Sequence, residues 1–166
     1  MRILRKNTDM TEKVTGSAKA HIRVSDSMRE AVDLLNDKPY LEKNILLTTG
    51  SKHLPDYTKI QDYQNRAYLR LLPSPEMLQK AVDTGFLPAH LIAMQGPFSQ
   101  ELNVALIKQS GIGVLVTKQS GKSGGFEEKI SAAEQTGTDV IVIKRPKQED
   151  GKNLSEAEAE LKKLMT

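Results

Sequence analysis

The chain has 166 residues, which is enough for one domain of ordinary size with its own buried core. It contains no cysteine and only three scattered histidines, so disulfides, cysteine nucleophiles and a dedicated metal site are not expected. The net charge of +3 is mild and only 4% of the residues are aromatic, which disfavours a nucleic-acid partner. No apolar run is long enough to cross a membrane, and the N-terminus lacks the apolar segment of a secretory signal. We therefore expect a cytoplasmic protein.

Residues 1–24 are polar and show little periodicity, so we expect a flexible leader or linker there, outside the core. A helix is predicted at about 28–37. Ser27 and Glu30 form a capping box, in which each side chain satisfies a free backbone N–H at the start of the helix. Met28, Ala31 and Leu35 then follow on one face of that helix.

Five short apolar runs come next, at 44–49, 67–72, 90–95, 113–118 and 139–144. Four of them are almost continuously apolar, which is typical of strands buried on both faces. The run at 67–72 (AYLRLL) alternates more and is expected at an edge of the sheet. Helices are predicted after Ser74, after Ser99 and over 126–136, whereas 53–66 holds at most a short helix.

This alternation of strands and helices predicts an α/β fold with a doubly wound, mostly parallel sheet of about five strands, of Rossmann-like type. Residues 25–147 are expected to form that domain. The charged stretch after it is expected to be a linker, and 148–166 to contain a C-terminal helix that docks on the core or joins two copies of the chain.

Ligands of open α/β sheets bind at the carboxyl ends of the strands, and three loops there have unusual compositions. The first follows the strand at 44–49 and contains Thr49, Gly50, Ser51 and Lys52. Glycine lets backbone N–H groups approach an anion, the hydroxyls donate hydrogen bonds and the lysine adds charge. An ordinary turn with a helix-capping serine is an equally good interpretation of this loop alone.

The second loop contains Gly96, Pro97, Phe98 and Ser99, before a predicted helix whose N-terminus favours anions. Phe98 is either a wall for a flat ligand or a cover for the core.

The third loop, 117–125, contains three glycines and two lysines between a strand and a helix. Its candidate residues are Lys118, Ser120, Gly121, Gly124 and Gly125, and we favour anion binding over a plain surface loop. The loop matches neither the Walker pattern nor GxGxxG, which disfavours phosphoryl transfer of the kinase or GTPase type.

Other candidates are weaker. His53 and His90 lie near predicted strand ends, where a lone histidine is more often structural than catalytic. Arg145 ends the last strand and could bind an anion or form a salt bridge. No GxSxG turn is present, so no Ser-His-Asp triad can be assembled, and the catalytic residues stay unknown.

In chain order, ILLTTGSK, RLLPSPEML, IAMQGPFSQELN, TKQSGKSGG and VIVIKRP resemble the precorrin-6A reductase family of cobalamin biosynthesis, which includes the cobalt-precorrin-6A reductases. The resemblance covers about residues 25–147. It implies an oxidoreductase that transfers a hydride from NADPH or NADH to a carbon–carbon double bond of a corrin precursor. The fold it implies has two Rossmann-like halves, with the nucleotide and the tetrapyrrole substrate between them. It also implies that the residues of the three loops bind cofactor or substrate.

The sequence departs from this family in two places. Nothing before residue 25 resembles the strand–GGT–helix unit that opens the family's N-terminal half, so we expect the chain to be the C-terminal half. A missing N-terminal half or a homo-oligomer would then complete the site. Gln119 stands where a shorter acidic or amide residue is expected, which leaves the proton donor open. The alternative hypotheses are a non-catalytic Rossmann-like module that binds an anionic nucleotide or tetrapyrrole, and an interaction domain that uses the C-terminal helix.

Overall fold

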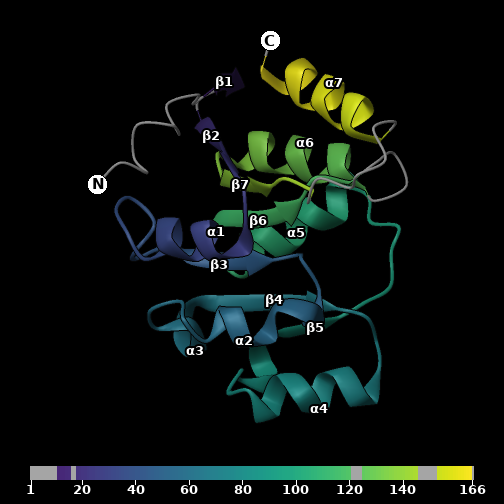
Figure 1. Ribbon diagram of the computed structural model, residues 1–166. Helices are drawn as coiled ribbons and strands as arrows, with labels where there is room; N and C mark the ends of the chain where they lie inside the picture. Colours follow the sequence, from purple (N-terminus) through teal and green to yellow (C-terminus); the bar gives the residue numbers. More distant parts are fainter. Residues whose placement is uncertain (1–10, 16–17, 121–124, 146–152, 166) are drawn as a thin grey trace.

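The computed structural model describes residues 11–15, 18–120, 125–145 and 153–165. Within these ranges seven strands form one sheet in the order β1-β2-β7-β6-β3-β4-β5 (Figure 1). Strands β2 to β7 pair in parallel, and β1 runs antiparallel to β2. The predicted α/β class with a doubly wound, mostly parallel sheet is therefore confirmed. The strands are β1 Thr11–Thr15, β2 Ala18–Ser25, β3 Asn44–Leu47, β4 Ala67–Leu71, β5 Leu91–Ala93, β6 Ile112–Lys118 and β7 Asp139–Ile143.

Helices cover both faces of the sheet. One face carries α1 Met28–Leu35, α2 Leu54–Tyr57, α3 Tyr63–Arg66 and α4 Pro75–Asp83, and the other carries α5 Gln100–Gln109, α6 Phe126–Thr136 and α7 Asn153–Met165. The predicted helix starts are confirmed by hydrogen bonds. The hydroxyls of Ser27, Ser74 and Ser99 each accept from the backbone N–H three residues further on, as N-caps do.

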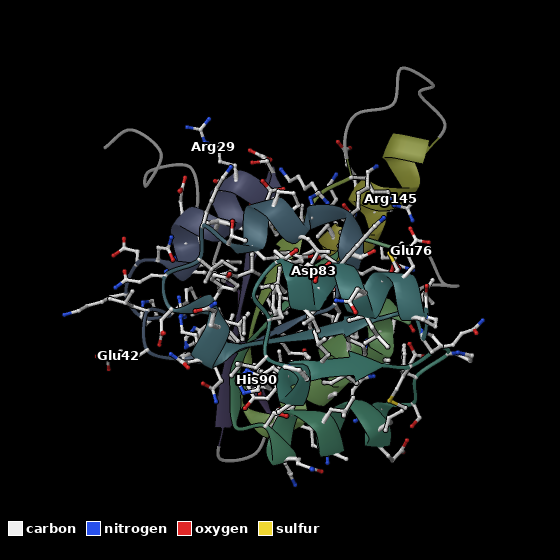
Figure 2. The ribbon with its side chains drawn as sticks, turned by 90° about the horizontal axis from the view of Figure 1, so that it is seen from below. Arg29, Glu42, Glu76, Asp83, His90 and Arg145 are labelled. Atoms are coloured by element: carbon white, nitrogen blue, oxygen red, sulfur yellow. The ribbon has the colours of Figure 1, made fainter. Side chains whose placement is uncertain are left out.

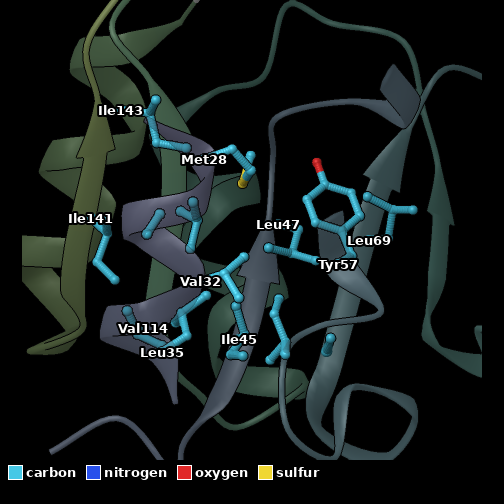
Figure 3. Packing of buried hydrophobic residues seen from close by; sticks show 14 of the residues in the cluster. Met28, Val32, Leu35, Ile45, Leu47, Tyr57, Leu69, Val114, Ile141 and Ile143 are labelled. Atoms are coloured by element: carbon cyan, nitrogen blue, oxygen red, sulfur yellow. The ribbon is translucent and has the colours of Figure 1, made fainter. Parts of the chain in front are cut away.

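The core consists of two layers, because successive residues of a strand point to opposite faces. Ile45 and Leu47 of β3 lie on the face of α1, with Val114 of β6 and Ile141 of β7 beside them (Figure 3). Leu46 lies on the opposite face, under α5 and α6. Both faces of the central strands are therefore buried, which explains their nearly continuous apolar runs. Figure 1 shows α7 beside α6, and Leu161 of α7 is buried in the same layer as Leu46.

The sheet begins earlier in the chain than expected. Residues 18–24, predicted to be part of a flexible leader, belong to β2, which pairs with β7. Ala20 and Ile22 are buried, but polar residues alternate with them, so no continuous apolar run marks the strand. Residues 1–10 and 16–17 of that leader lie outside the described residues, and so do 146–152, which include most of the linker predicted at 147–153.

The position predicted for the run at 67–72 is wrong. This run forms β4, which lies between β3 and β5, so β5 rather than β4 is at that edge of the sheet. The run alternates because Arg70 is buried under the opposite face from Leu69 and Leu71, not because one face meets solvent.

Charged side chains such as Arg29 and Glu42 lie on the outside of the molecule (Figure 2). No helix in the described part of the chain combines the length and the apolar character that crossing a membrane requires.

Gly85, just after α4, has a backbone conformation that excludes larger residues. Its φ is +109°, and a Cβ atom at this position would collide with the hydroxyl of Tyr63. That hydroxyl donates a hydrogen bond to the carbonyl of Thr84 (2.7 Å), which limits how far the ring can move. We expect Gly85→Ala to lower the free energy of unfolding by about 2 kcal/mol, measured by urea denaturation.

Gly111→Ala is the matched control, because Gly111 also has a positive φ (+59°) but its nearest neighbour would lie 3.8 Å from a Cβ. A loss no larger in Gly85→Ala than in Gly111→Ala would contradict the role of the Tyr63 contact.

Candidate functional site

The candidate site lies where the chain leaves β3 and β6 at the carboxyl edge of the sheet. These strands are neighbours and parallel, but β3 leads into α2 and α3 on one face, whereas β6 leads into α6 on the other. At this point the connections between strands switch from one face of the sheet to the other, and doubly wound proteins bind their ligands at such a switch point. Thr49–Lys52 after β3 and Lys118–Ser120 at the end of β6 flank it, and the loop with Gly96–Ser99 follows β5 at the same edge, two strands away.

The loop after β3 is held by its own hydroxyls. Buried Thr49 is hydrogen-bonded to the hydroxyl of Tyr57, which donates to the carbonyl of Gly50 (2.8 Å). The hydroxyl of Ser51 donates to the sulfur of Met77 (3.0 Å). The hydroxyls of Thr49 and Ser51 are therefore used within the protein, whereas the side chain of Lys52 is exposed. Gly50 has a φ of +78° and nothing within 4 Å of the position of a Cβ.

The loop after β6 brings a second lysine to this position. Burial of the ammonium, followed by the nearby charge of Lys52, lowers the pKa of Lys118. The two lysines, from loops on the two sides of the switch point, therefore lie close enough for their charges to repel. A dianion or a polyanion between them would relieve this repulsion.

The backbone beyond Lys118 is fixed by the end of β7. The N–H of buried Gln119 donates to the carbonyl of Ile143 (2.9 Å), and its carbonyl accepts from Nε of Arg145 (2.9 Å). Arg145 thus holds the loop after β6. The hydroxyl of Ser120 is buried and has no hydrogen-bond partner among the described residues. Gly125 precedes α6 with a φ of +65°, and Gly121 and Gly124 lie outside the described residues.

The loop after β5 turns back toward the centre of the sheet. A cis peptide bond joins Gly96 and Pro97, and the ring of Phe98 lies 3.9 Å from the guanidinium carbon of Arg70 in β4. A Cβ on Gly96 would lie 3.2 Å from that ring, so the glycine leaves room for it. Ser99 caps α5. Phe98 therefore covers a charged side chain of the protein's own core.

Of the two weaker candidates, His90 lies away from this site, whereas His53 directly follows Lys52 in the loop after β3. His90 lies before β5, at the amino edge of the sheet, and stacks on Tyr68 with ring centroids 4.1 Å apart. His53 is 3.2 Å from the carboxylate of Asp56. A pocket of about 460 Å³ also lies at the amino edge, lined by Leu41, Glu42, Asn44, Gln61, Asp62, Asn65 and Arg66. It contains no residue of the three predicted loops.

Sequence reasoning missed Arg70, Asn103 and Lys129, which gather with Thr117 of the third predicted loop on the face of α5 and α6. Arg70 could have been found from its place as the one charged residue inside an otherwise mostly apolar strand. The signal for Lys129 was its spacing from Phe126 and Ile130, which places it on the buried face of α6.

Comparison with known proteins decides the family. Residues 1–163 match the family model described as "Precorrin-6x reductase CbiJ/CobK". The chain belongs to the precorrin-6x reductase family. A relative from Priestia megaterium named "Cobalt-precorrin-6A reductase" is 43% identical over 111 residues, which cover 64% of this chain and 43% of the relative. A relative of the same name from Methanothermobacter thermautotrophicus is 44% identical over 81 residues, which cover 49% of this chain and 27% of the relative.

The fold of this family member is also that of a solved relative. The structure named "CobK precorrin-6A reductase" superposes with a TM-score of 0.58 at 25% identity, covering 82% of this chain and 52% of that chain. The resemblance to the family seen in the loop sequences is thus confirmed. The chain spans less than half the length of the two curated relatives described above.

Proposed function

We propose that the chain is part of a precorrin-6A reductase, an oxidoreductase that reduces a carbon–carbon double bond of a corrin precursor with NADPH or NADH. The family match over residues 1–163 carries this proposal. The meeting of two cationic loops at the switch point of the sheet supports it, because the dinucleotide and the polycarboxylate macrocycle are both anionic.

The residues at the switch point fit a dinucleotide. The open space beside Gly50 lets a phosphate approach the backbone, and the charges of Lys52 and Lys118, from the loops after β3 and β6, would favour it. The unsatisfied hydroxyl of Ser120 is a further donor for such a group. When bound, the nicotinamide supplies the hydride. The reduced double bond also takes up one proton, so the site must hold a donor for it.

Each predicted site residue has a proposed role in this site. Thr49 and Ser51 position the loop after β3. Ser99 and Gly125 start the helices α5 and α6, whose N-termini favour anionic groups. Gly96, Pro97 and Phe98 line the side of the macrocycle, and Gly121 and Gly124 belong to the anion-binding loop.

Lys118→Met is expected to weaken the binding of NADPH about tenfold, equivalent to about 1.4 kcal/mol, because one charge-assisted contact to a phosphate is lost. Isothermal titration calorimetry at low ionic strength measures this. Lys108→Met is the control, since Lys108 is exposed near the end of α5 and its charge lies away from the carboxyl edge. Equal losses of NADPH affinity in both variants would mean that the net charge of the chain, and not a contact of Lys118, causes the effect.

Reduction of precorrin-6A by NADPH or NADH, followed for the chain alone and with a supplied N-terminal half, tests the activity itself. Turnover in either mixture supports the proposal, and its absence from both contradicts it. The second candidate is a non-catalytic module that binds an anionic nucleotide or tetrapyrrole, favoured by the fraction of its relatives that the chain spans. Binding without reduction selects that candidate.

A homo-oligomer that completes the site, a cytoplasmic location, the lack of nucleic-acid and membrane partners and the division at residues 25 and 147 stay predictions from the sequence.

A further inference from the structure

Two cationic side chains are buried near one another on the face of the sheet that α5 and α6 cover. Arg70 of β4 is 5% exposed and Lys129 of α6 is 8% exposed. They are close enough that the charge of Arg70 contributes to lowering the pKa of Lys129. No carboxylate lies within ion-pair distance of either group among the residues that the structure describes. The pair is therefore a concentrated positive charge that no described carboxylate neutralises by an ion pair.

The hydrogen bonds around the pair leave most of its donors unused. One guanidinium nitrogen of Arg70 donates to Oδ1 of Asn103 (2.7 Å), whose amide in turn donates to the carbonyl of Ser99 (2.9 Å). The ammonium of Lys129 donates to the hydroxyl of Thr117 (3.3 Å). A guanidinium has five N–H donors and an ammonium three, so the described neighbours satisfy only a minority of them.

This arrangement is costly without a ligand. Burial of an ion costs several kcal/mol unless an opposite charge compensates for it, and two like charges side by side add to the cost. The pKa of Lys129 falls to about 8, mainly through burial and then through the charge of Arg70, with the carboxylate of Glu128 acting weakly in the opposite direction. At neutral pH both groups remain largely protonated.

The pair lies near the carboxyl edge of the sheet, where ligands of open α/β sheets bind. Arg70 is the last residue but one of β4, and Thr117 the last but one of β6, so both lie near the carboxyl edge. Arg70 also contacts Phe98 of the loop after β5, and Lys129 lies in the first turns of α6, after the glycine-rich loop. The pair therefore lies between the loop after β5, the end of β6 and the first turn of α6.

We propose that Arg70 and Lys129 form a buried subsite for an oxyanion, a carboxylate or a phosphate of a ligand that enters at the carboxyl edge. The inference rests on the proposed function, in which the substrate carries carboxylates and the cofactor carries phosphates. Asn103 orients the guanidinium, and Thr117 holds the ammonium toward the anion.

The test uses the full chain at pH 7 and constant ionic strength, with two probes: tricarballylate for carboxylates and pyrophosphate for phosphates. We expect at least one probe to bind in calorimetry and to raise the pKa of Lys129, followed through the ¹³C signal of its Cε. Lys129→Met should weaken that binding at least tenfold, and Lys129→Arg should restore most of it. Lys108→Met, an exposed lysine of α5, should leave it unchanged.

The probe that binds identifies the source of the oxyanion, the substrate for tricarballylate and the cofactor for pyrophosphate. Absence of binding by both probes, or equal binding by Lys129→Met and the unaltered chain, would overturn the subsite. The reductase assay separates this failure from that of the proposed function. If anions bind through Lys129 but the chain neither binds NADPH nor turns over, only the proposed function is wrong. If Lys129→Met changes neither turnover nor anion binding, only the subsite is wrong.

Discussion

Replacing Arg66 by methionine is expected to lower the free energy of unfolding by about 3–5 kcal/mol. Arg66 is 5% exposed and donates to four backbone carbonyls. Nε donates to Gln61 (2.7 Å), Nη2 to Leu35 (2.9 Å), and Nη1 to both Tyr40 (2.9 Å) and Lys43 (3.1 Å). These carbonyls belong to the end of α1, to the connection from α1 to β3, and to the loop before α3. Methionine fills most of the space but leaves all four carbonyls without this donor.

Urea denaturation followed by circular dichroism measures this loss. Arg66→Lys keeps the charge but cannot span four carbonyls, so its loss should be intermediate. Arg29→Met removes an exposed arginine from α1 and should stay within about 0.5 kcal/mol of the unaltered chain. A loss below about 1 kcal/mol for Arg66→Met would mean that water replaces the guanidinium, and the structural role assigned to Arg66 would be wrong.

The sequence predicts the central sheet well, because its signals are local and strong. Strands β3, β6 and β7 are apolar at nearly every position, since both of their faces are covered, and serine caps mark the helix starts. The same reasoning misses β2, because His21 and Arg23 interrupt its apolar residues. A strand of this kind is recognised only through its partner β7, which lies more than 110 residues later in the chain.

The candidate site is predictable in position but not in detail. Parallel strands place all their carboxyl ends at one edge, so the loops after β3, β5 and β6 necessarily share it. Which hydroxyls remain available there depends on distant partners. The hydroxyl of Thr49 is bound to Tyr57 and that of Ser51 to Met77, and neither contact leaves a pattern in the loop sequence.

The buried cations show why charge is harder to place than apolar residues. The alternation in the run at 67–72 predicts an edge strand, and a charged residue in a strand, such as Arg70, usually faces water. The structure instead covers it with Phe98 and Asn103, which come from segments about 30 residues later. Alternation in a strand thus identifies which residues share a face, but not whether that face is buried.

The stability of the chain is expected to rise by about 2–3 kcal/mol between pH 7 and pH 10 through Lys129 alone. Burial of the ammonium, and then the charge of Arg70 in β4, lower the pKa of Lys129 from 10.5 to about 8 in the folded chain, and the charge of Glu128 opposes them weakly. Between these two values the unfolded chain binds more protons than the folded chain. Stability therefore increases with pH across this interval, and the cost of the charged lysine is fully present below pH 8.

Lys129→Met should abolish this rise, and at pH 7 in chloride buffer the variant should be more stable than the unaltered chain. The free energy of unfolding of both proteins, measured in urea at half-unit steps from pH 7 to pH 10, tests this. The difference between them cancels other titrating groups, including Tyr40, whose pKa burial raises to about 12. Lys108→Met should follow the unaltered chain. If the stability curve of Lys129→Met ran parallel to that of the unaltered chain, Lys129 would carry no buried charge. The proposal that Arg70 and Lys129 form an uncompensated pair of buried cations would then be wrong.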